Sequence, residues 1–232
     1  MAERPVFIPK INGDVLVETD MVNFTYHSGF SISQKQKSIL SLHESILDKY
    51  GFDNILEVSS KSLDEIGVAL SAFNLMITTK SKKVSFSVEN AFQSSKVFEG
   101  GVQYIDLLKK SSREAKKDSR LKNSGSIIAF RFYGEEWPTS PLTAFYDWIY
   151  INALKQRVEY HEPILNFQAF TDIEFNPKKS INCQAYSLAL FQSLLKRDIL
   201  EEATSSQENF LKLYNDFTVE NTYTKNENGL LF

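Results

Sequence analysis

The chain has little of what marks several common kinds of protein. Its 232 residues include one cysteine, Cys183, and three histidines, His27, His43 and His161. A single thiol excludes an intrachain disulfide framework and leaves no thiolate cluster for zinc or iron–sulfur binding. The histidines show no metal-ligand spacing, and no G-x-G-x-x-G, P-loop, G-x-S-x-G or H-E-x-x-H motif occurs. We therefore expect no metal and no cofactor.

Long apolar runs and an excess of one charge are missing as well. No stretch of about 18 uninterrupted apolar residues occurs, and charges interrupt the N-terminal MAERPVFIPK where a secretory signal needs an apolar run. The formal net charge is -3 with 24% charged residues, so the surface has no general polybasic field. These absences predict a cytoplasmic protein with no membrane partner, in which any anion site is local.

What the sequence does contain is a mixture of helical and strand patterns. Strand patterns occur in VLVETDMVNFTY, LMITT, KVSF and SIIAFRFYG, and helical spacing occurs in SQKQKSILSLHESILDKY, LTAFYDWIYINALKQ and YSLALFQSLLKRDIL. Ser87 is a good N-cap for a further helix, Gly51 is a plausible C-cap, and EEWPTSP has the composition of a loop. Asp147, in LTAFYDWIYINALKQ, is a candidate buried charge that would need a partner.

These patterns predict an α+β fold, as a helix-rich single domain with a small β-sheet. At 42% hydrophobic residues the chain buries a sizeable core. We expect one domain over residues 1–232, with its core at roughly 56–197, an N-terminal strand and helix extension over 1–55, and a peripheral C-terminal segment over 198–232.

The segment SFSVENAFQSSKVF places three polar residues among apolar ones. On a helix, Gln93 lies roughly 40° from Glu89 and Lys96 about 20° to its other side, so all three project from one face. An acid, an amide and an amine on one face can supply acid–base, orienting and nucleophilic groups. A solvated face with a weak charge pair is the alternative. The surrounding aromatic and aliphatic residues favour a buried helix.

A local positive patch follows in YIDLLKKSSREAKKDSRLK, which contains Arg113, Lys116 and Lys117. Arginine and lysine recognise phosphate oxygens by charge-assisted hydrogen bonds, so this patch can hold a pyrophosphate or a nucleic acid backbone. A solvated helix face is the other interpretation.

Several of these motifs together resemble the NADAR (YbiA-like) superfamily. SVENAFQSSKVF resembles its S-x-E-H-x-x-Q-x-x-K-F signature, with Asn90 in place of the histidine, and LSAFN resembles its L-S-N-F-Y segment. REAKKDSRLK is similar to its basic stretch, and TDIEFNPKKSINCQAYSLALF to its terminal block. In that block Phe175 stands where the family has tryptophan, and Asn176 and Pro177 where it has glycines. RPVFIPK, SGFSISQKQKSILSLHE and YGEEWP resemble the branch of NADAR antitoxins that is associated with DarT-type toxins.

The resemblance implies an ADP-ribosyl glycohydrolase that removes ADP-ribose from guanine bases in DNA and so acts as antitoxin to a DarT-type ADP-ribosyltransferase toxin. Lys96 would attack the ribose, Glu89 would carry a proton, and Asp172 would stabilise positive charge on the ribose. The substrate-binding residues implied by the same motifs are Ser71, Asn74, Gln93, Arg113, Lys116, Lys117, Phe175 and Asn182.

Two other functions remain open at this stage. The first keeps the fold and makes the chain an N-glycosidase of a small phosphorylated ribosylamine metabolite, as some relatives resemble such enzymes. Alternatively it is a non-catalytic antitoxin that binds ADP-ribose or the toxin itself, in which case protection survives the loss of Lys96 and Glu89.

Overall fold

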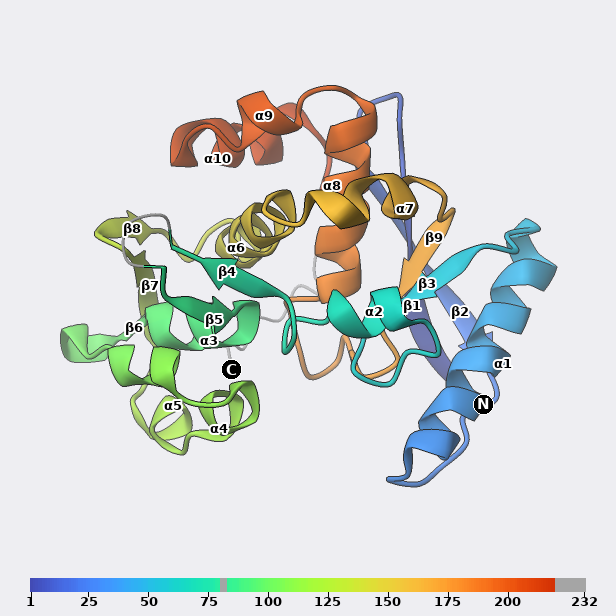
Figure 1. The fold of residues 1–232 in the computed structure, drawn as a ribbon, viewed down its shortest axis with the longest axis horizontal. Coiled ribbons are helices and arrows are strands. Elements are labelled where there is room, and N and C mark those ends of the chain that lie inside the picture. Colours follow the sequence, from blue (N-terminus) through green and yellow to red (C-terminus); the bar gives the residue numbers. More distant parts are fainter. Residues whose placement is uncertain (80–82, 220–232) are drawn as a thin grey trace.

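In the computed structural model, which describes residues 1–79 and 83–219, a four-stranded sheet lies between two long helices (Figure 1). The strand order is β2-β1-β9-β3, in which β1 runs antiparallel to β2 and β9, and β3 runs parallel to β9. These strands are β1 (Ala2–Pro9), β2 (Val17–Phe24), β3 (Ile55–Glu57) and β9 (Ala169–Thr171). Helix α1 (Ile32–Tyr50) covers one face and helix α8 (Gln184–Lys196) covers the other.

The remaining elements are two smaller sheets and a set of shorter helices. Two strands pair as β4 (Met76–Thr78) with β5 (Ser85–Ser87), and three pair in the order β6 (Lys96–Phe98), β7 (Ile127–Phe132) and β8 (Glu135–Trp137). The helices are α2 (Glu65–Ala69), α3 (Val88–Ser95), α4 (Ser112–Lys117), α5 (Arg120–Asn123), α6 (Ala144–Lys155), α7 (His161–Leu165), α9 (Leu200–Ala203) and α10 (Gln207–Asp216). Short 3₁₀ helices are η1 (Glu99–Gly101), η2 (Ile105–Lys109) and η3 (Val158–Tyr160).

Strand β1 is buried on both faces, and its alternation explains how the two halves of the core form. Val6 and Ile8 pack toward α1, while Phe7 points the other way and meets Tyr186 of α8 at 5.7 Å between ring centroids. Sequence analysis did not predict this strand, although β1 is one of the two inner strands of the sheet. The division into a core over 56–197 and an N-terminal extension stays a prediction.

The predicted long helix is confirmed as α1. The Ser31 hydroxyl accepts a hydrogen bond from the Gln34 amide at the N-terminus, and Gly51 ends the helix in the left-handed conformation at φ 71°. Ile39, Leu42 and Ile46 recur at helical spacing and are buried against the sheet. The cap residues and the apolar spacing therefore act together, as the sequence indicated.

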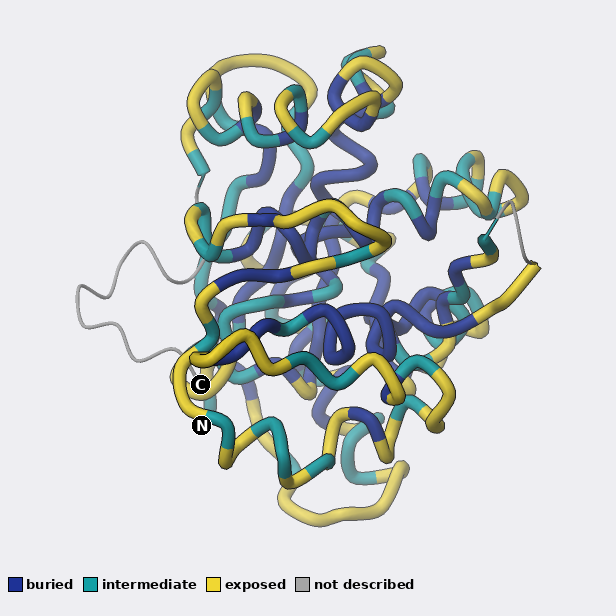
Figure 2. Tube along the Cα trace, turned by 90° about the vertical axis from the view of Figure 1, so that its left-hand side faces the viewer, coloured by how far each residue is buried: buried dark blue, intermediate teal, exposed yellow. Residues whose placement is uncertain are grey.

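Helices α6 and α8 pack together at the centre of the molecule, and the most deeply buried part of the chain runs through them (Figure 2). One expectation was wrong here: Glu135–Trp137, at the start of the predicted loop EEWPTSP, forms strand β8. Trp137 pairs with Phe130 across the ladder and packs against Phe145 at 5.7 Å. Burial of the indole outweighs the loop-like composition around it.

The α+β prediction, with a helical majority in a single domain, is confirmed. The polar KSKK predicts a turn that falls largely on residues 80–82, and the end of the predicted C-terminal segment falls on 220–232; both lie outside the described residues. Within the part of the chain that the structure describes, no helix is long and apolar enough to cross a membrane.

Candidate functional site

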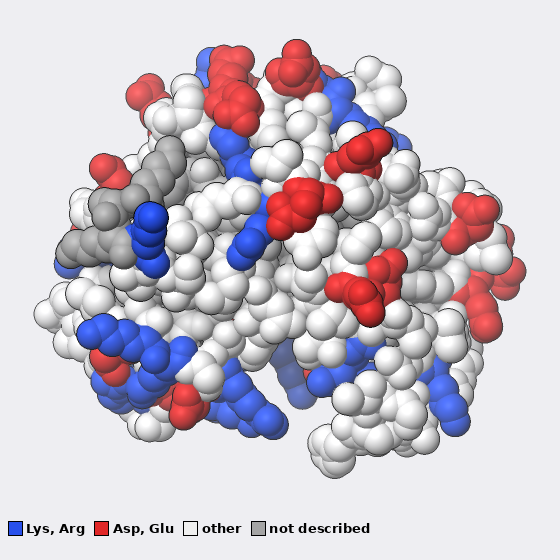
Figure 3. Space-filling view, in the orientation of Figure 1, with Lys and Arg blue, Asp and Glu red and all other residues white. Residues whose placement is uncertain are grey.

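A cavity of about 560 Å³ lies where several connecting segments meet beside helix α4. In Figure 3, lysine and arginine side chains gather over α4 and α5 and border the notch between this region and α1. The lining combines acids, cations and aromatic rings: Ser59, Ser60, Lys61, Ala72, Phe73, Glu89, Arg113, Lys116, Lys117, Tyr146, Asp172, Glu174, Phe175, Ser180, Asn182 and Gln184. Seven residues predicted from sequence are among them, namely Glu89, Arg113, Lys116, Lys117, Asp172, Phe175 and Asn182.

Glu89 occupies the first turn of α3, and it is only 4% exposed. The Ser87 side chain caps this helix by accepting a hydrogen bond from the Asn90 amide, as predicted. One carboxylate oxygen of Glu89 accepts a hydrogen bond of 2.8 Å from Gln93 Nε2, and the other lies 3.7 Å from Lys116 Nζ. The acid is thus held in place by an amide on one side and a cation on the other.

Sequence analysis predicted that Lys96 lies on the same helix as Glu89 and Gln93. This prediction was wrong. Helix α3 ends at Ser95, and Lys96 has extended backbone geometry (φ -62°, ψ 125°) because it begins β6 and pairs with Phe130. Its side chain is half-buried, with Nζ 4.9 Å from the centroid of the Phe92 ring. Because the helix ends before Lys96, this side chain does not continue the helical face of Glu89 and Gln93. The charge of Glu89 still acts on the Lys96 amine.

The Lys96 amine is set apart by its environment. Among the described residues, no hydrogen-bond acceptor or ion-pair partner contacts Nζ. The pKa of Lys96 is lowered to about 8, mainly by burial; the charge of Glu89 opposes this shift and the charge of Lys116 adds to it. About one tenth of such amines are neutral at pH 7, so this side chain has nucleophilic character that an exposed lysine lacks.

Asp172 follows strand β9 and is held by the loop that it begins. It is 6% exposed, and Oδ1 accepts hydrogen bonds from the Glu174 and Phe175 amides at 3.0 and 3.2 Å. Oδ2 accepts one of 2.9 Å from Gln184 Nε2. Burial raises the pKa of Asp172 to about 7, and the negative charge of Glu57 adds to this shift.

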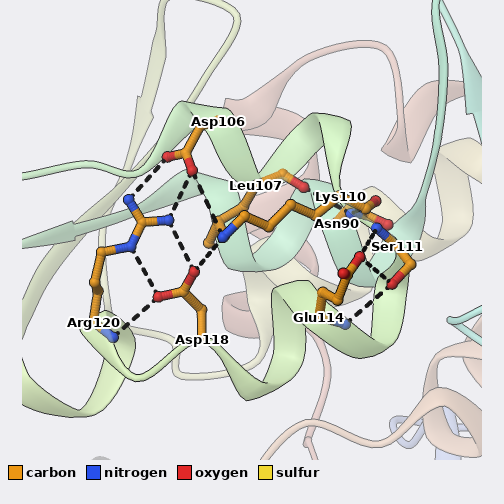
Figure 4. Close-up of polar contacts among 8 residues, drawn as sticks. All are labelled: Asn90, Asp106, Leu107, Lys110, Ser111, Glu114, Asp118 and Arg120. Atoms are coloured by element: carbon orange, nitrogen blue, oxygen red, sulfur yellow. Dashed lines mark hydrogen bonds and ion pairs between the residues drawn. The ribbon is translucent and has the colours of Figure 1, made fainter.

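The cations around α4 divide into two groups, of which Figure 4 shows the first, Lys110 and Arg120. Arg120 bridges Asp106 and Asp118 with contacts of 2.7 and 2.8 Å, and Lys110 lies 2.7 Å from Asp118. These hydrogen bonds from Arg120 hold the pKa of both acids below their usual range. Lys110 and Arg120 are therefore committed to structure, while Arg113, Lys116 and Lys117 line the cavity.

Asn90, which replaces the histidine of the motif, fixes the segment that carries those cations (Figure 4). Its Nδ2 donates to the carbonyl oxygens of Leu107 and Lys110 at 2.7 and 2.8 Å, and its Oδ1 accepts a hydrogen bond from Ser87 Oγ at 2.5 Å. The capping box of Ser111 and Glu114 then starts α4. The amide ties α3 to the entrance of α4.

The other predicted residues are placed less uniformly. Gln93 stands behind Glu89, and its Oε1 is buried without a hydrogen-bond partner among the described residues, as is Oδ1 of Asn182. Ser71 is fully buried and donates to the Val68 carbonyl, while Asn74 lines a separate groove of about 490 Å³ beside α2. Four predicted residues are therefore not part of the cavity lining, namely Ser71, Asn74, Gln93 and Lys96. Phe175 lines it but packs mostly against Phe7.

Sequence analysis missed three residues that shape this site. Gln184 connects separate segments: Nε2 donates to the Val58 carbonyl and to Asp172, and Oε1 accepts from the Ala72 amide. Tyr146 of α6 forms part of the lining, and Glu57 lies buried behind Asp172. Only Glu57 left a signal in the sequence, as an acid within the apolar ILEV segment.

Comparison with known proteins assigns the chain to a family. No group of three or more histidine, cysteine or acidic residues suited to a metal occurs within residues 1–79 and 83–219. The sequence matches none of the curated proteins to which it was compared. The family model of the DarT1-associated NADAR antitoxin matches residues 2–224. Since this match spans nearly the entire chain, the protein belongs to the DarT1-associated NADAR antitoxin family.

Proposed function

We propose that the protein is an ADP-ribosyl glycohydrolase that removes ADP-ribose from guanine bases in DNA, and that this reaction reverses the modification made by the DarT-type toxin. The observation that carries the proposal is the meeting of Glu89, Asp172 and the cations of α4 around one cavity, with the low-pKa amine of Lys96 within their electrostatic reach. A site that only bound an anion would have no need for two buried acids.

In the proposed reaction, neutral Lys96 attacks the ribose carbon that bears the base. The bond from this carbon to the guanine nitrogen breaks, and the nitrogen takes the electron pair and a proton that Glu89 carries to it from the alkylated Lys96 amine. The sugar ring then opens to a Schiff base on Lys96. Water adds to its carbon, and collapse of the adduct returns the amine and releases ADP-ribose. The balance is one water consumed and one guanine restored.

The other residues would bind the substrate and stabilise the positive charge that forms on its ribose. Ionised Asp172 would stabilise the positive charge that develops on the ribose, and Gln93 and Asn182 would orient its hydroxyl groups through their unpartnered buried oxygens. The cations Arg113, Lys116 and Lys117 would hold the pyrophosphate or the DNA strand. Phe175 would contribute its ring to the wall of the same cavity. Ser71 and Asn74, which lie away from the cavity, would act only by shaping the segment that contains Ala72 and Phe73.

The test uses an oligonucleotide that carries ADP-ribosyl guanine. Mass spectrometry should find free ADP-ribose and unmodified guanine after incubation with the native protein, but not with Lys96→Ala or Glu89→Gln. Lys109→Ala, at a position outside the cavity lining, is the matched control and should keep full activity. Full activity in the first two variants would contradict the proposed roles. Tight binding to the oligonucleotide or to the toxin without any release would identify a non-catalytic antitoxin instead.

A further inference from the structure

Glu57 is a buried acid that the proposed reaction does not use. It ends strand β3 beside β9, is 2% exposed, and pairs in parallel register with Thr171, the residue before Asp172. No ion pair reaches its carboxylate from any described residue. A lone buried acid is costly, so its position calls for an explanation.

Its hydrogen bonds show what it holds. Oε2 accepts from the Thr171 hydroxyl at 2.7 Å, and Oε1 accepts from the Ile173 amide at 2.9 Å. These two residues immediately precede and follow Asp172. Glu57 therefore fixes the chain on both sides of Asp172, the predicted catalytic acid. The carboxylate oxygens of Asp172 accept hydrogen bonds from Gln184 and two loop amides.

The surroundings give this pair of acids little positive charge. His43 of α1 lies 3.0 Å from Thr171 Oγ1, and because the threonine donates its hydrogen to Glu57, it accepts one from His43 Nε2. Burial lowers the pKa of His43 to about 4, so the ring is neutral at pH 7. Burial likewise raises the pKa values of Tyr146, Tyr150 and Cys183, which therefore stay neutral.

Besides the pair itself, one cation and one acid of the described residues act on Asp172 and Glu57. Lys116 of α4 favours the ionised form of Asp172, and Glu174 disfavours that of Glu57. The side chains of Lys116 and Glu174 are 56% and 44% exposed, so solvent screens their charges. Two carboxyl groups buried near each other without a buried cation do not both ionise easily.

We propose that Glu57 is a positioning residue for Asp172, which fixes the backbone on both sides of it, and that the two buried carboxyls share one proton around neutral pH. This inference rests on the proposed function, because it assigns Asp172 its protonation state in that reaction. Ionised Asp172 stabilises the ribose cation, so activity should rise with pH as the pair loses its last shared proton. The removal of the Glu57 charge should let Asp172 ionise at lower pH.

Carboxyl ¹³C NMR titration tests the pair without any reaction. The native protein should show a buried carboxyl that titrates near neutral pH and is absent in Asp172→Asn. In Glu57→Gln this titration should move down by about one pH unit or more. Glutamine preserves the contact with the Ile173 amide, and the Thr171 hydroxyl can accept from its NH₂ group. Asp172 that titrates close to its ordinary value in the native protein would overturn the proposal, even if Glu57→Gln did not fold.

The pH profile of ADP-ribose release separates positioning from mere stability. Glu57→Gln should shift the acidic limb of kcat/KM downward, whereas Glu162→Gln, at an exposed position of α7 outside the cavity lining, should leave it in place. Equal loss of activity at every pH without a shift would mean that Glu57 only supports the fold. If the native protein released no ADP-ribose but the NMR titration behaved as described, the proton-sharing pair would stand and the proposed function would fail.

Discussion

Asp147 and Asp172 are both deeply buried acids, at 1% and 6% exposure, but they have different neighbours. Asp147 accepts hydrogen bonds from Ser187 at 2.5 Å and Tyr214 at 2.8 Å, and it joins α6, α8 and α10. Asp172 is held by two amides and Gln184, and it lines a cavity beside cationic side chains. Burial raises the pKa of both, to about 6 and about 7. A raised pKa by itself therefore does not mark a functional acid; access to the cavity distinguishes the two.

The largest expected effect separates the two acids by activity. Asp172→Asn should lower kcat/KM for ADP-ribose release by about 100-fold or more, because the charge that stabilises the ribose cation is removed. Asp147→Asn should change it by less than about threefold, because its carboxylate contacts only core hydroxyls. Circular dichroism should confirm that both variants are folded. A similar loss in both would remove the functional distinction between these two acids.

The second prediction concerns stability against pH. Burial raises the pKa of Asp147 from its ordinary 3.8 to about 6, so the folded state binds this proton more tightly than the unfolded state does. Its contribution to the free energy of unfolding should therefore fall by about 3 kcal/mol as pH rises from about 4 to above 6.

Urea unfolding at several pH values can isolate this contribution. The difference between the native protein and Asp147→Asn should decrease over that pH range, because asparagine keeps the shape and loses the ionisation. A difference that stays constant with pH would show that Asp147 titrates normally.

The third prediction removes one neighbour of the core acid. Tyr214→Phe should lower the free energy of unfolding by about 1–2 kcal/mol, because Asp147 loses one hydrogen bond in a buried site. Activity should not change. Tyr133→Phe is the control, since the Tyr133 hydroxyl has no hydrogen-bond partner within the described residues and its side chain is 64% exposed. Equal destabilisation by both substitutions would show that the Tyr214 bond contributes little.

The smallest effect is expected at the rim of the cavity. Lys116→Met should weaken ADP-ribose binding by roughly fivefold at low salt and by less at high salt, because the lysine is half exposed and its charge is screened. Isothermal titration calorimetry of Lys109→Met, which leaves the cavity lining intact, supplies the comparison. Equal weakening in the two variants would indicate a general charge effect and not a defined anion site.

Local features of the fold were accessible from sequence. Apolar spacing and the C-cap Gly51 predicted α1, and the N-cap Ser87 predicted the start of α3, because these signals act within a few residues. The prediction that Lys96 extends α3 was wrong, because pairing with Phe130 turns the chain into β6. A partner 34 positions away, from residue 96 to residue 130, leaves no trace in local spacing.

The candidate site was predicted in part for the same reason. Signature residues predicted Glu89, Lys96 and Asp172, and the basic run predicted Arg113, Lys116 and Lys117; all of these except Lys96 line the cavity. The run did not reveal that Lys110 and Arg120 are neutralised by Asp106 and Asp118, since composition cannot assign ion pairs. Gln184 and Glu57 act through contacts with distant segments, so neither belonged to a recognisable motif.

The sequence by itself determined which chemical groups the chain carries, where α1 ends and α3 begins, and that metal-binding clusters of cysteine are impossible. Tertiary structure alone decided which of these groups meet, as when β3 and β9 bring Glu57 beside Asp172 across 115 positions, from residue 57 to residue 172. It also decided their protonation, because the pKa of a carboxyl or an amine depends on burial and on neighbouring charges that exist only after folding.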